Sequence, residues 1–427
     1  MHEDFEPEKE FAYSLDAEDP LADLRSKFYL PEDTLYMDGN SLGPLSKPAK
    51  ESIERVISEW EQLGIEGWTD ADPPWFWYGE YLGEKLAPLI GANPDEVVVG
   101  NSTTVNIHTL IGTFLDAIDG NTILVNNLDF PTDHYAIRSQ LRIRGLDPNN
   151  HLRIIESQDG YTINESKIIE VMETEDIDIL FFPSVLYQSG QRFRMQKLTE
   201  EAHKRNICVG FDIAHSIGVM PHSFGEWDVD FAVWCNYKYI NGGPGAIAAL
   251  YVNDKHFDKV PSLTGWWGHE KSTQFDMNLT YTPADSAGAW QIGTIPILSA
   301  APIEGALDIF DETDIETVRD KSVQVTSYLE YLITERIDDP SLEIVTPKPR
   351  EHRGGHIAIT HPDAYRISQA LRDKDVIVDF RDPDIIRICP APLYTQYQDV
   401  WSVVAELNDI LRTETYQDYD KEKDGVT

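Results

Sequence analysis

Two neighbouring segments decide the fold of this chain: CVGFDIAHSIG at residues 208–218 and FAVWCNYKYINGGPG at residues 231–245. Each segment begins with a short run of apolar residues and continues into polar ones. Short continuous apolar runs are typical of strands that are buried on both faces of a sheet. In open α/β sheets, ligands bind at the carboxyl ends of the strands. The polar residues that follow these two runs are therefore candidates for a binding site.

Asp212 and Lys238 lie at these two predicted strand ends, 26 positions apart (238 − 212). A lysine can form a Schiff base with the aldehyde of pyridoxal phosphate, and a carboxylate can hold the proton on its pyridine nitrogen. The pair therefore indicates a pyridoxal-phosphate site. For these two residues alone, an ion pair at the edge of a sheet is the alternative interpretation.

The composition is that of a globular protein, with 427 residues of which 41% are hydrophobic. No apolar run approaches the ~18 residues of a membrane span, and the acidic N-terminus MHEDFEPEKEF does not resemble a signal peptide. Three cysteines do not make a disulfide framework. We therefore expect a protein of the reducing cytoplasm, with no membrane as a partner and no metal site.

The charge balance is strongly acidic, with 74 Asp and Glu against 35 Lys and Arg and a net charge of −39. Nucleic acids and anionic lipids require positive surface, so neither is expected as a partner. Because the acidic residues are spread along the whole chain, the composition favours a surface adapted to high salt. A merely acidic protein without such adaptation is the alternative.

An alternation of strands and helices begins near residue 96 and predicts one large α/β domain with a mainly parallel sheet. The seven predicted strands are Glu96–Val99, Thr122–Asn126, His151–Ile155, Asp178–Phe182, Cys208–Ile213, Phe231–Cys235 and Ala246–Val252. The predicted helices between them are Thr104–Ala117, Thr132–Arg144, Glu165–Glu173 and Thr199–Arg205.

The chain is expected to divide into four parts. They are an N-terminal arm and loop over residues 1–50, the large α/β domain over 51–302, a smaller α+β domain over 303–414 and a disordered acidic tail over 415–427. The smaller domain should begin with a long helical segment that runs to about residue 337. Its predicted strands are Leu342–Val345, His356–Thr360, Val376–Phe380 and Ile385–Ile388, and its other predicted helices are Ala364–Lys374 and Val400–Leu411. A helical pattern is also present at Pro20–Phe28, and another at Lys50–Gln62.

Further candidates lie at other strand ends. Thr103 and Thr104 open a predicted helix, where free backbone N–H groups can bind a phosphate, although a plain helix cap is the alternative. Phe130 could stack on a planar ring and Asp133 could bind its substituents. Arg387, on an otherwise apolar strand, could hold a substrate carboxylate or make a structural salt bridge.

Seven motifs together resemble the kynureninase family. They are YMDGNSLGPL at 36–45, NSTTVN at 101–106, FPTDHY at 130–135, FDIAHSIG at 211–218, NYKYINGGPG at 236–245, GWWGH at 265–269 and IRICPAPLY at 386–394. FDIAH with NYKY suits several families of fold-type-I pyridoxal-phosphate enzymes, whereas GNSLG and GWWGH make the match more specific. The resemblance implies a fold of the aspartate-aminotransferase type and pyridoxal 5'-phosphate as the cofactor.

The resemblance also implies roles for individual residues. Lys238 would bear the cofactor as a Schiff base, and Asp212 would contact its pyridine nitrogen. His215 and Phe130 would flank the ring, Thr103, Thr104 and Tyr237 would hold the phosphate, and Trp266 and Thr294 would join them from the other subunit of a homodimer. Asp133 and Ser184 would complete the cofactor shell, Arg387 would bind the substrate α-carboxylate, and Ser41 and Trp68 would line the substrate pocket.

The activity implied by the resemblance is hydrolysis of L-kynurenine to anthranilate and L-alanine. Lys238 would remove the α-proton and Tyr237 is the candidate general acid. The pathway would be tryptophan catabolism, with a role in NAD biosynthesis left open. Some relatives have a histidine near the position of Trp68 and a Ser-Asn pair in place of Gly293 and Thr294. 3-Hydroxykynurenine therefore remains open as a substrate, and we favour the unhydroxylated form.

Two alternatives remain within the same fold, an aminotransferase and a cysteine desulfurase. A desulfurase needs a reactive cysteine on an exposed loop, whereas Cys208 and Cys235 fall in predicted buried strands and Cys389 follows Arg387 in an apolar run. A non-catalytic relative is a third possibility. It should have lost the lysine or its acidic partner, and both are present.

Overall fold

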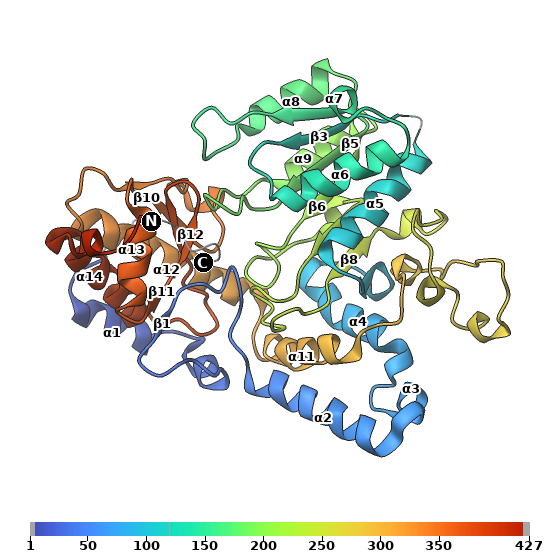
Figure 1. Cartoon of the computed structure of the whole chain (residues 1–427), viewed down its shortest axis with the longest axis horizontal. Helices are drawn as coiled ribbons and strands as arrows, with labels where there is room; N and C mark the ends of the chain where they lie inside the picture. The colour runs from blue at the N-terminus through green and yellow to red at the C-terminus, as the bar shows by residue number, and fades with distance from the viewer. Residues whose placement is uncertain (1–4, 119, 422–427) are drawn as a thin grey trace.

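The computed structural model describes residues 5–118 and 120–421 (Figure 1). Its largest sheet has seven strands in the order β2-β8-β7-β6-β5-β3-β4. The bounds are β2 Val97–Val99, β3 Ile123–Asn126, β4 Leu152–Ile155, β5 Ile179–Pro183, β6 Cys208–Asp212, β7 Phe231–Trp234 and β8 Ala249–Val252. β4, β3, β5, β6 and β7 pair in parallel, and β8 runs antiparallel to both β7 and β2. The predicted seven-stranded, mainly parallel sheet is confirmed.

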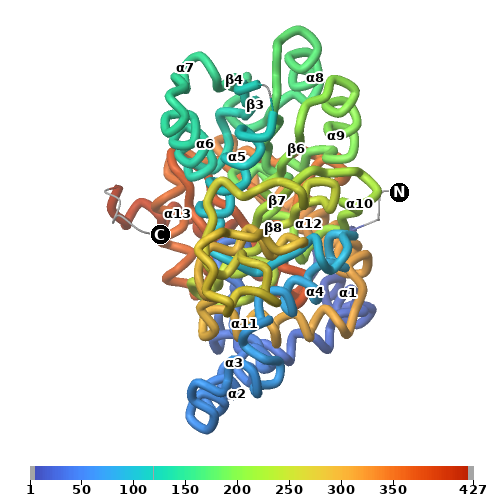
Figure 2. The backbone as a smooth tube through the Cα atoms, turned by 90° about the vertical axis from the view of Figure 1, so that its right-hand side faces the viewer, coloured from blue at the N-terminus to red at the C-terminus, as the bar shows by residue number. Residues whose placement is uncertain are grey.

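Helices cover both faces of this sheet, because successive side chains of a strand point to opposite faces. Phe181 packs in one apolar core with the helices α5 and α6, whereas its neighbour Phe182 packs in another with α4, α8 and α9. Figure 2 shows α5 and α6 on one side of β3 and β6, with α8 and α9 on the other. The helix bounds are α4 Tyr78–Ile90, α5 Thr103–Ala117, α6 Pro131–Ile143, α8 Glu165–Thr174 and α9 Met195–His203.

A second, antiparallel sheet lies beside the first, with the strand order β12-β13-β10-β9. Its strands are β9 Glu343–Ile344, β10 Ile357–Thr360, β12 Asp379–Arg381 and β13 Ile385–Ile388. A separate apolar core joins it to four helices, which are α1 Lys9–Ala17, α12 Ile315–Arg336, α13 Ala364–Arg372 and α14 Tyr397–Thr413. The N-terminal and C-terminal parts of the chain are therefore packed together.

One loop runs from a third, two-stranded sheet to the end of the large one. The short strand β1 (Leu35–Tyr36) pairs in parallel with β11 (Val376–Ile377). Beyond β1 the chain turns, and the N–H of Gly43 donates to the carbonyl of Tyr237 over 2.8 Å. A Cβ atom at Gly43 would lie 2.5 Å from the backbone oxygen of Lys238, so this close approach requires glycine. Residues 37–46 are thereby held against the segment that contains Lys238.

The remaining helices include α2 Lys47–Leu63, α3 Gly67–Asp70, α7 Pro148–His151, α10 Phe224–Trp227 and α11 Ile297–Asp308. α11 packs along α2, and the predicted domain boundary at 302/303 falls inside it. Among residues 5–118 and 120–421, no helix combines the length and apolar character that crossing a bilayer requires.

Several local predictions are wrong. The helical pattern at Pro20–Phe28 forms a 3-10 helix over Ala22–Lys27, and helix α1 before it was not predicted. The single long helical segment to residue 337 is two helices, α11 and α12, which are separated by the turn around Phe310–Glu312. The single strand Val376–Phe380 is divided into β11 and β12, which belong to different sheets.

The predicted disordered tail begins with ordered residues. Thr415–Asp418 form a 3-10 helix, and Tyr416 is buried in the core of the smaller sheet. Tyr416 also packs edge-on against His361, with the ring centroids 5.6 Å apart. Residues 422–427 of the predicted tail lie outside the described residues.

Candidate active site

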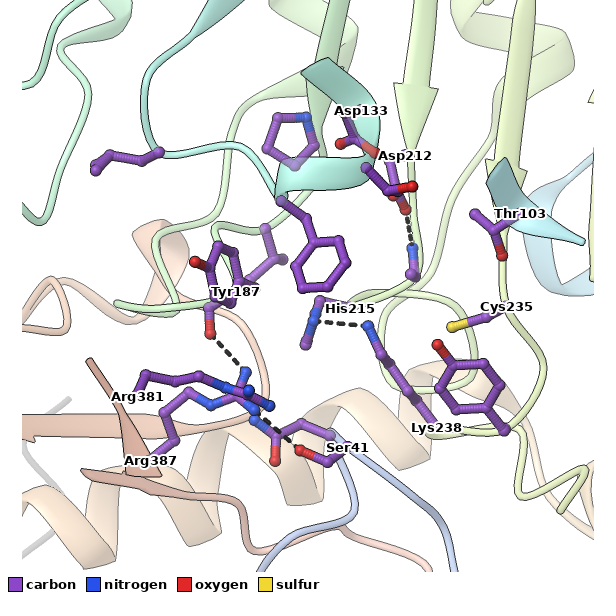
Figure 3. Close-up of a pocket in the computed structure, with 18 of the residues that line it drawn as sticks. Ser41, Thr103, Asp133, Tyr187, Asp212, His215, Cys235, Lys238, Arg381 and Arg387 are labelled. Carbon is purple, nitrogen blue, oxygen red and sulfur yellow. Dashed lines mark hydrogen bonds between the residues drawn. The ribbon is translucent and has the colours of Figure 1, made fainter. Parts of the chain in front are cut away.

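A cavity of about 250 Å³ opens where the carboxyl ends of the parallel strands face the smaller sheet. Ten of the residues predicted for the site line it: Ser41, Thr103, Thr104, Phe130, Asp133, Asp212, His215, Tyr237, Lys238 and Arg387. They come from strands, helix starts and loops that are far apart in the chain, and Figure 3 shows several of them directed toward one space. The strand ends place them together because parallel strands present their carboxyl ends at one edge of a sheet.

Asp212 is the last residue of β6 and is partly buried at the wall of the cavity. Its Oδ1 accepts a hydrogen bond from the backbone N–H of Ala214 over 2.8 Å. Burial raises the pKa of this carboxyl, whereas the charge of Lys238 lowers it. Asp212 therefore has a proton affinity that its neighbours control. Such a carboxyl is suited to face a protonated ring nitrogen.

Lys238 follows β7 by four residues and lies next to His215. The Nζ of Lys238 is 2.8 Å from the Nε2 of His215. Burial and the nearby charge of Lys238 hold the pKa of His215 well below its usual value, so the imidazole is neutral and Nε2 can accept a hydrogen bond from the ammonium. The ring of His356 is the next neighbour of the His215 ring, and the two ring centroids are 6.2 Å apart. The lysine is thus held by a neutral acceptor.

Tyr237 lines the same cavity, and its hydroxyl interacts with the thiol of Cys235. Interaction with Cys235 and burial both raise the pKa of Tyr237 above its usual value. Burial also raises the pKa of the Cys235 thiol. The phenol therefore keeps its proton and can donate it to a group in the cavity.

Two helix N-termini point toward the cavity. At α5, Thr103 and Thr104 are the first two residues, and Ser102 caps the helix by accepting from the N–H of Val105. The hydroxyl of Thr104 is 2.7 Å from that of Thr132 in the first turn of α6. Free N–H groups, hydroxyls and the helix dipole at such an end are suited to bind a phosphate.

Phe130 and Asp133 border the cavity from the start of α6. The ring of Phe130 is 47% exposed and lies edge-on to that of Tyr187, so one face is available for stacking. Asp133 is buried, its Oδ1 has no hydrogen-bond partner, and burial together with Asp212 raises its pKa well above the usual value. An unpaired buried carboxyl oxygen at this place is suited to a hydrogen bond from a ligand.

Arg387 approaches from β13 in the smaller sheet. Its Nη1 donates to the carbonyl of Tyr187 over 2.7 Å and its Nη2 to the hydroxyl of Ser41 over 2.9 Å. It is also ion-paired with Asp379 on the neighbouring strand. The structural salt bridge that the sequence left open is therefore present, and the same guanidinium borders the cavity.

Four predicted site residues lie outside the cavity of this subunit. Ser184 is fully buried and accepts a hydrogen bond from the hydroxyl of Ser216 over 2.7 Å. Trp68 packs edge-on against Trp75 within an aromatic cluster, with ring centroids 5.9 Å apart. Trp266 and Thr294 are exposed to solvent.

The other residues that line the cavity were not predicted for the site, and they include Asn40, Tyr187, Cys235 and Arg381. Cys235 lies two residues before Tyr237, at the end of an apolar run, and was interpreted only as a buried thiol. Arg381 lies six residues before Arg387, in the segment DFRDPD. A second arginine directly after the predicted strand Val376–Phe380 was the available signal.

Solved structures of pyridoxal-phosphate enzymes are similar to this chain in shape. A cysteine desulfurase from Thermococcus onnurineus superimposes with a TM-score of 0.78 and 16% identity, covering 92% of this chain and 98% of that one. A C-DES variant with glycine covalently linked to its PLP cofactor has a TM-score of 0.78 and 17% identity, covering 90% of this chain and 99% of that one. The fold is therefore that of the fold-type-I pyridoxal-phosphate enzymes.

Sequence comparison defines the family. A family model described as the kynureninase C-terminal domain matches residues 318–407. Kynureninase from Geobacillus thermodenitrificans is 50% identical over 422 residues, which cover 99% of this chain and 98% of the relative. Kynureninase from Bacillus anthracis is 49% identical over 425 residues, which cover 99% of each. The chain belongs to the kynureninase family, and a desulfurase or an aminotransferase is not favoured.

Pyridoxal phosphate is accordingly the cofactor, and the cavity provides suitable groups for each part of it. Lys238 can bind its aldehyde carbon and Asp212 its ring nitrogen. The unpaired oxygen of Asp133 can accept a hydrogen bond from a polar substituent of the cofactor ring. The exposed face of Phe130 can stack on that ring. The hydroxyls at the start of α5 remain for the phosphate.

Proposed function

We propose that this protein hydrolyses L-kynurenine to anthranilate and L-alanine. The observation on which the proposal rests is the convergence of Lys238, Asp212, Tyr237 and Arg387 on one cavity. Membership in the kynureninase family, at about half identity over nearly the whole chain, supports the same activity. The lysine, the acid and the arginine would each act on a different part of one amino acid substrate.

The cofactor, when bound, supplies an electron sink for the negative charge that develops on the substrate. Lys238 would remove the proton from the α-carbon, and its amine nitrogen would carry that proton as an ammonium. His215, whose Nε2 is 2.8 Å away, would orient this ammonium by accepting a hydrogen bond. Arg387 would hold the α-carboxylate and so fix which bond at the α-carbon faces Lys238.

Cleavage requires water at the side-chain carbonyl and a proton at the β-carbon. Water adds to the γ-carbon, the Cβ–Cγ bond breaks, and the acyl fragment leaves as anthranilate. The electron pair of the broken bond remains at the β-carbon, and the phenol of Tyr237 would protonate it to complete the methyl group of alanine. Tyr237 fits this role because it borders the cavity with its proton retained.

The assignment is tested by anthranilate fluorescence from purified protein that is given L-kynurenine and pyridoxal phosphate in molar salt. We expect anthranilate from the wild type and a loss of at least about 100-fold in Lys238→Ala, the lower end of what a positioned proton-transfer group contributes. Lys255→Ala, which removes an exposed amine near Asp228, is the matched control. No anthranilate from wild-type protein that visibly holds the cofactor would reject the proposal.

We further propose a homodimer in which each subunit completes the site of the other. The segment around residues 260–280 extends away from the body of the subunit (Figure 1). It exposes large apolar side chains, Trp266 at 47%, Phe275 at 66% and Met277 at 70%. Apolar side chains in such number on one exposed segment are typical of an interface. Trp266 and the exposed Thr294 would then contact the cofactor phosphate of the partner.

Three finer features of the function are also proposals: the location, the pathway and the preferred substrate. We propose the cytoplasm as the location, because the three cysteines form no disulfide in the described chain. Tryptophan catabolism is the proposed pathway, with NAD biosynthesis as a second outlet for the products. We favour kynurenine over 3-hydroxykynurenine, since Trp68 and Gly293-Thr294 stand where some relatives have a histidine and a Ser-Asn pair. Turnover of both substrates side by side would decide between them.

A further inference from the structure

Two arginines from the smaller sheet approach the cavity, and only Arg387 has a proposed role. Arg381 ends β12, and Asp379 two residues earlier pairs with Arg387 across the antiparallel ladder. Residues two apart on a strand, and residues directly opposite each other, share a face of the sheet. Asp379, Arg381 and Arg387 therefore project from one face, and Figure 3 shows the two guanidinium groups side by side at the cavity.

The hydrogen-bonding capacity of Arg387 is largely used within the protein. A guanidinium has five N–H groups. The Nε–H of Arg387 donates to Asp379, Nη1 to the Tyr187 carbonyl, and Nη2 to Ser41, while Nη2 is also ion-paired with Asp379. At most two N–H groups remain, one on each terminal nitrogen. The side chain is 1% exposed, so Arg387 by itself does not present a free two-pronged fork.

Most of the hydrogen-bonding capacity of Arg381, in contrast, is unused within the protein. Its contact with protein is an ion pair from Nε to the Oδ2 of Asp379 over 2.9 Å. Its terminal nitrogens make no hydrogen bond with residues of the described ranges, and its side chain is 34% exposed in a position that lines the cavity. Four N–H groups of a permanent cation thus remain for a ligand.

The local charge is also compatible with an anionic ligand. The two guanidinium groups share the single carboxylate of Asp379, and both contact the same Oδ2. Asp38 is also nearby. Burial and Asp379 raise its pKa to about 6, so it is mainly ionised at neutral pH, but no ion pair joins it to either guanidinium in the described chain. The free terminal nitrogens of Arg381 can therefore bind a carboxylate that enters the cavity.

We propose that Arg381 is a substrate-binding residue that shares the α-carboxylate with Arg387. In this arrangement Arg387 contributes its remaining N–H groups from a fixed position, and Arg381 supplies the free fork. Asp379 aligns both guanidinium groups. Arg381 would then select substrates that have a carboxylate at this end over their uncharged analogues. The inference rests on the proposed function for the identity of the substrate, although not for the binding of the carboxylate.

The test measures binding, separately from turnover. Cofactor-loaded protein is titrated calorimetrically with 4-(2-aminophenyl)-4-oxobutanoate and with the corresponding carboxamide. The first compound is the substrate without its α-amino group. The wild type should prefer the carboxylate, and Arg381→Gln should lower that preference by about 10- to 100-fold, the range for a charge-assisted hydrogen bond. Arg381→Lys, which keeps the charge without the fork, should lie between them.

Arg153→Gln serves as the control, because Arg153 makes an ion pair with Glu175 on the surface. It should bind both ligands as the wild type does. An unchanged preference in Arg381→Gln, with wild-type cofactor absorbance, would overturn the inference. If that variant does not fold, a wild-type preference in Arg381→Lys would overturn it equally. A wild type that shows the carboxylate preference but releases no anthranilate from L-kynurenine would reject the proposed function and leave the role of Arg381 standing.

Discussion

The side chains around Lys238 take their properties from burial and from close neighbours. His215 is neutral because it is buried and lies 2.8 Å from the amine of Lys238. A second positive charge in that space would be unfavourable. Tyr237 keeps its proton because the Cys235 thiol and burial disfavour the phenolate. For these residues, the chemical role follows from the protonation state that the surroundings stabilise.

The first prediction at the residue scale concerns Tyr237. Tyr237→Phe removes the phenolic proton and leaves the ring, so kcat for anthranilate formation should fall by about 10²- to 10⁴-fold while the cofactor absorbance stays. Tyr135→Phe, at a side chain that is 69% exposed, is the control and should have wild-type kcat. Wild-type kcat in Tyr237→Phe would show that another group supplies the proton.

The second prediction concerns Asp38 and pH. Burial and Asp379 raise the pKa of Asp38 from 3.8 to about 6, so the folded state binds this proton more tightly than the unfolded chain does. The resulting stabilisation is present at acid pH and is lost as the pH rises through about 6. Asp38→Asn should therefore exceed the wild type in free energy of unfolding by about 2–3 kcal/mol at pH 8, and by little at pH 4.

Urea unfolding of the cofactor-free protein at both pH values measures this difference. Asp33→Asn is a suitable control, because Asp33 is exposed and its positive φ of 59° also suits asparagine. An Asp38→Asn variant that is less stable than the wild type at pH 8 would mean that the ionised carboxylate is required by Ser41 and Arg387.

Among the elements, the loop of residues 37–46 has the largest influence on the site. It connects β1, which pairs with β11, to α2, whose N-cap is Ser46. On the way it places Ser41 within 2.9 Å of the Arg387 guanidinium. It also contacts the backbone around Lys238 through Gly43. The loop therefore aligns the arginines of one sheet with the lysine of the other.

A glycine-to-alanine change tests this alignment. The added methyl group of Gly43→Ala would collide with the Asn241 side chain and lie 2.5 Å from the Lys238 oxygen. We expect a loss of about 1–3 kcal/mol in unfolding free energy and a raised KM, because the loop must move away from Lys238. Gly225→Ala, whose methyl would meet only the Gly91 oxygen at 3.2 Å, should change KM little. An unaltered KM in Gly43→Ala would show that the loop does not position the substrate.

Over the whole molecule, the dominant feature is the net charge of −39. Repulsion among exposed carboxylates opposes the compact state and is screened by salt, because the Debye length falls from about 10 Å at 0.1 M to about 3 Å at 1 M. We expect the midpoint of thermal unfolding to rise by about 10 °C or more between 0.1 and 2 M KCl at pH 7.5. At pH 5, near the sequence pI of about 4.5, the same salt should change the midpoint much less. Equal midpoints at pH 7.5 would show that the acidic surface is no adaptation to salt.

The large sheet could be predicted from the sequence because its strands are continuous apolar runs, and their order along the chain alternates with amphipathic helices. The small sheet was harder to predict. A strand prediction that treated residues 376–380 as one unit could not show that β11 pairs with β1, more than three hundred residues earlier in the chain. Helix α1 was missed because it has only nine residues and is stabilised by packing on α14, which the local sequence does not show.

The sequence by itself determined the chemistry that the site can contain: an acid and a lysine at consecutive strand ends, threonines at a helix start, and an arginine on an apolar strand. Local patterns suffice for this, because strand ends and helix starts are set by short stretches of chain. Only the tertiary structure decided which hydrogen-bond partners those groups have within the protein, and which donors stay free for a ligand. Arg387 is largely bound to protein and Arg381 has free donors, because Asp379, Tyr187 and Ser41 are brought to Arg387 from separate parts of the fold.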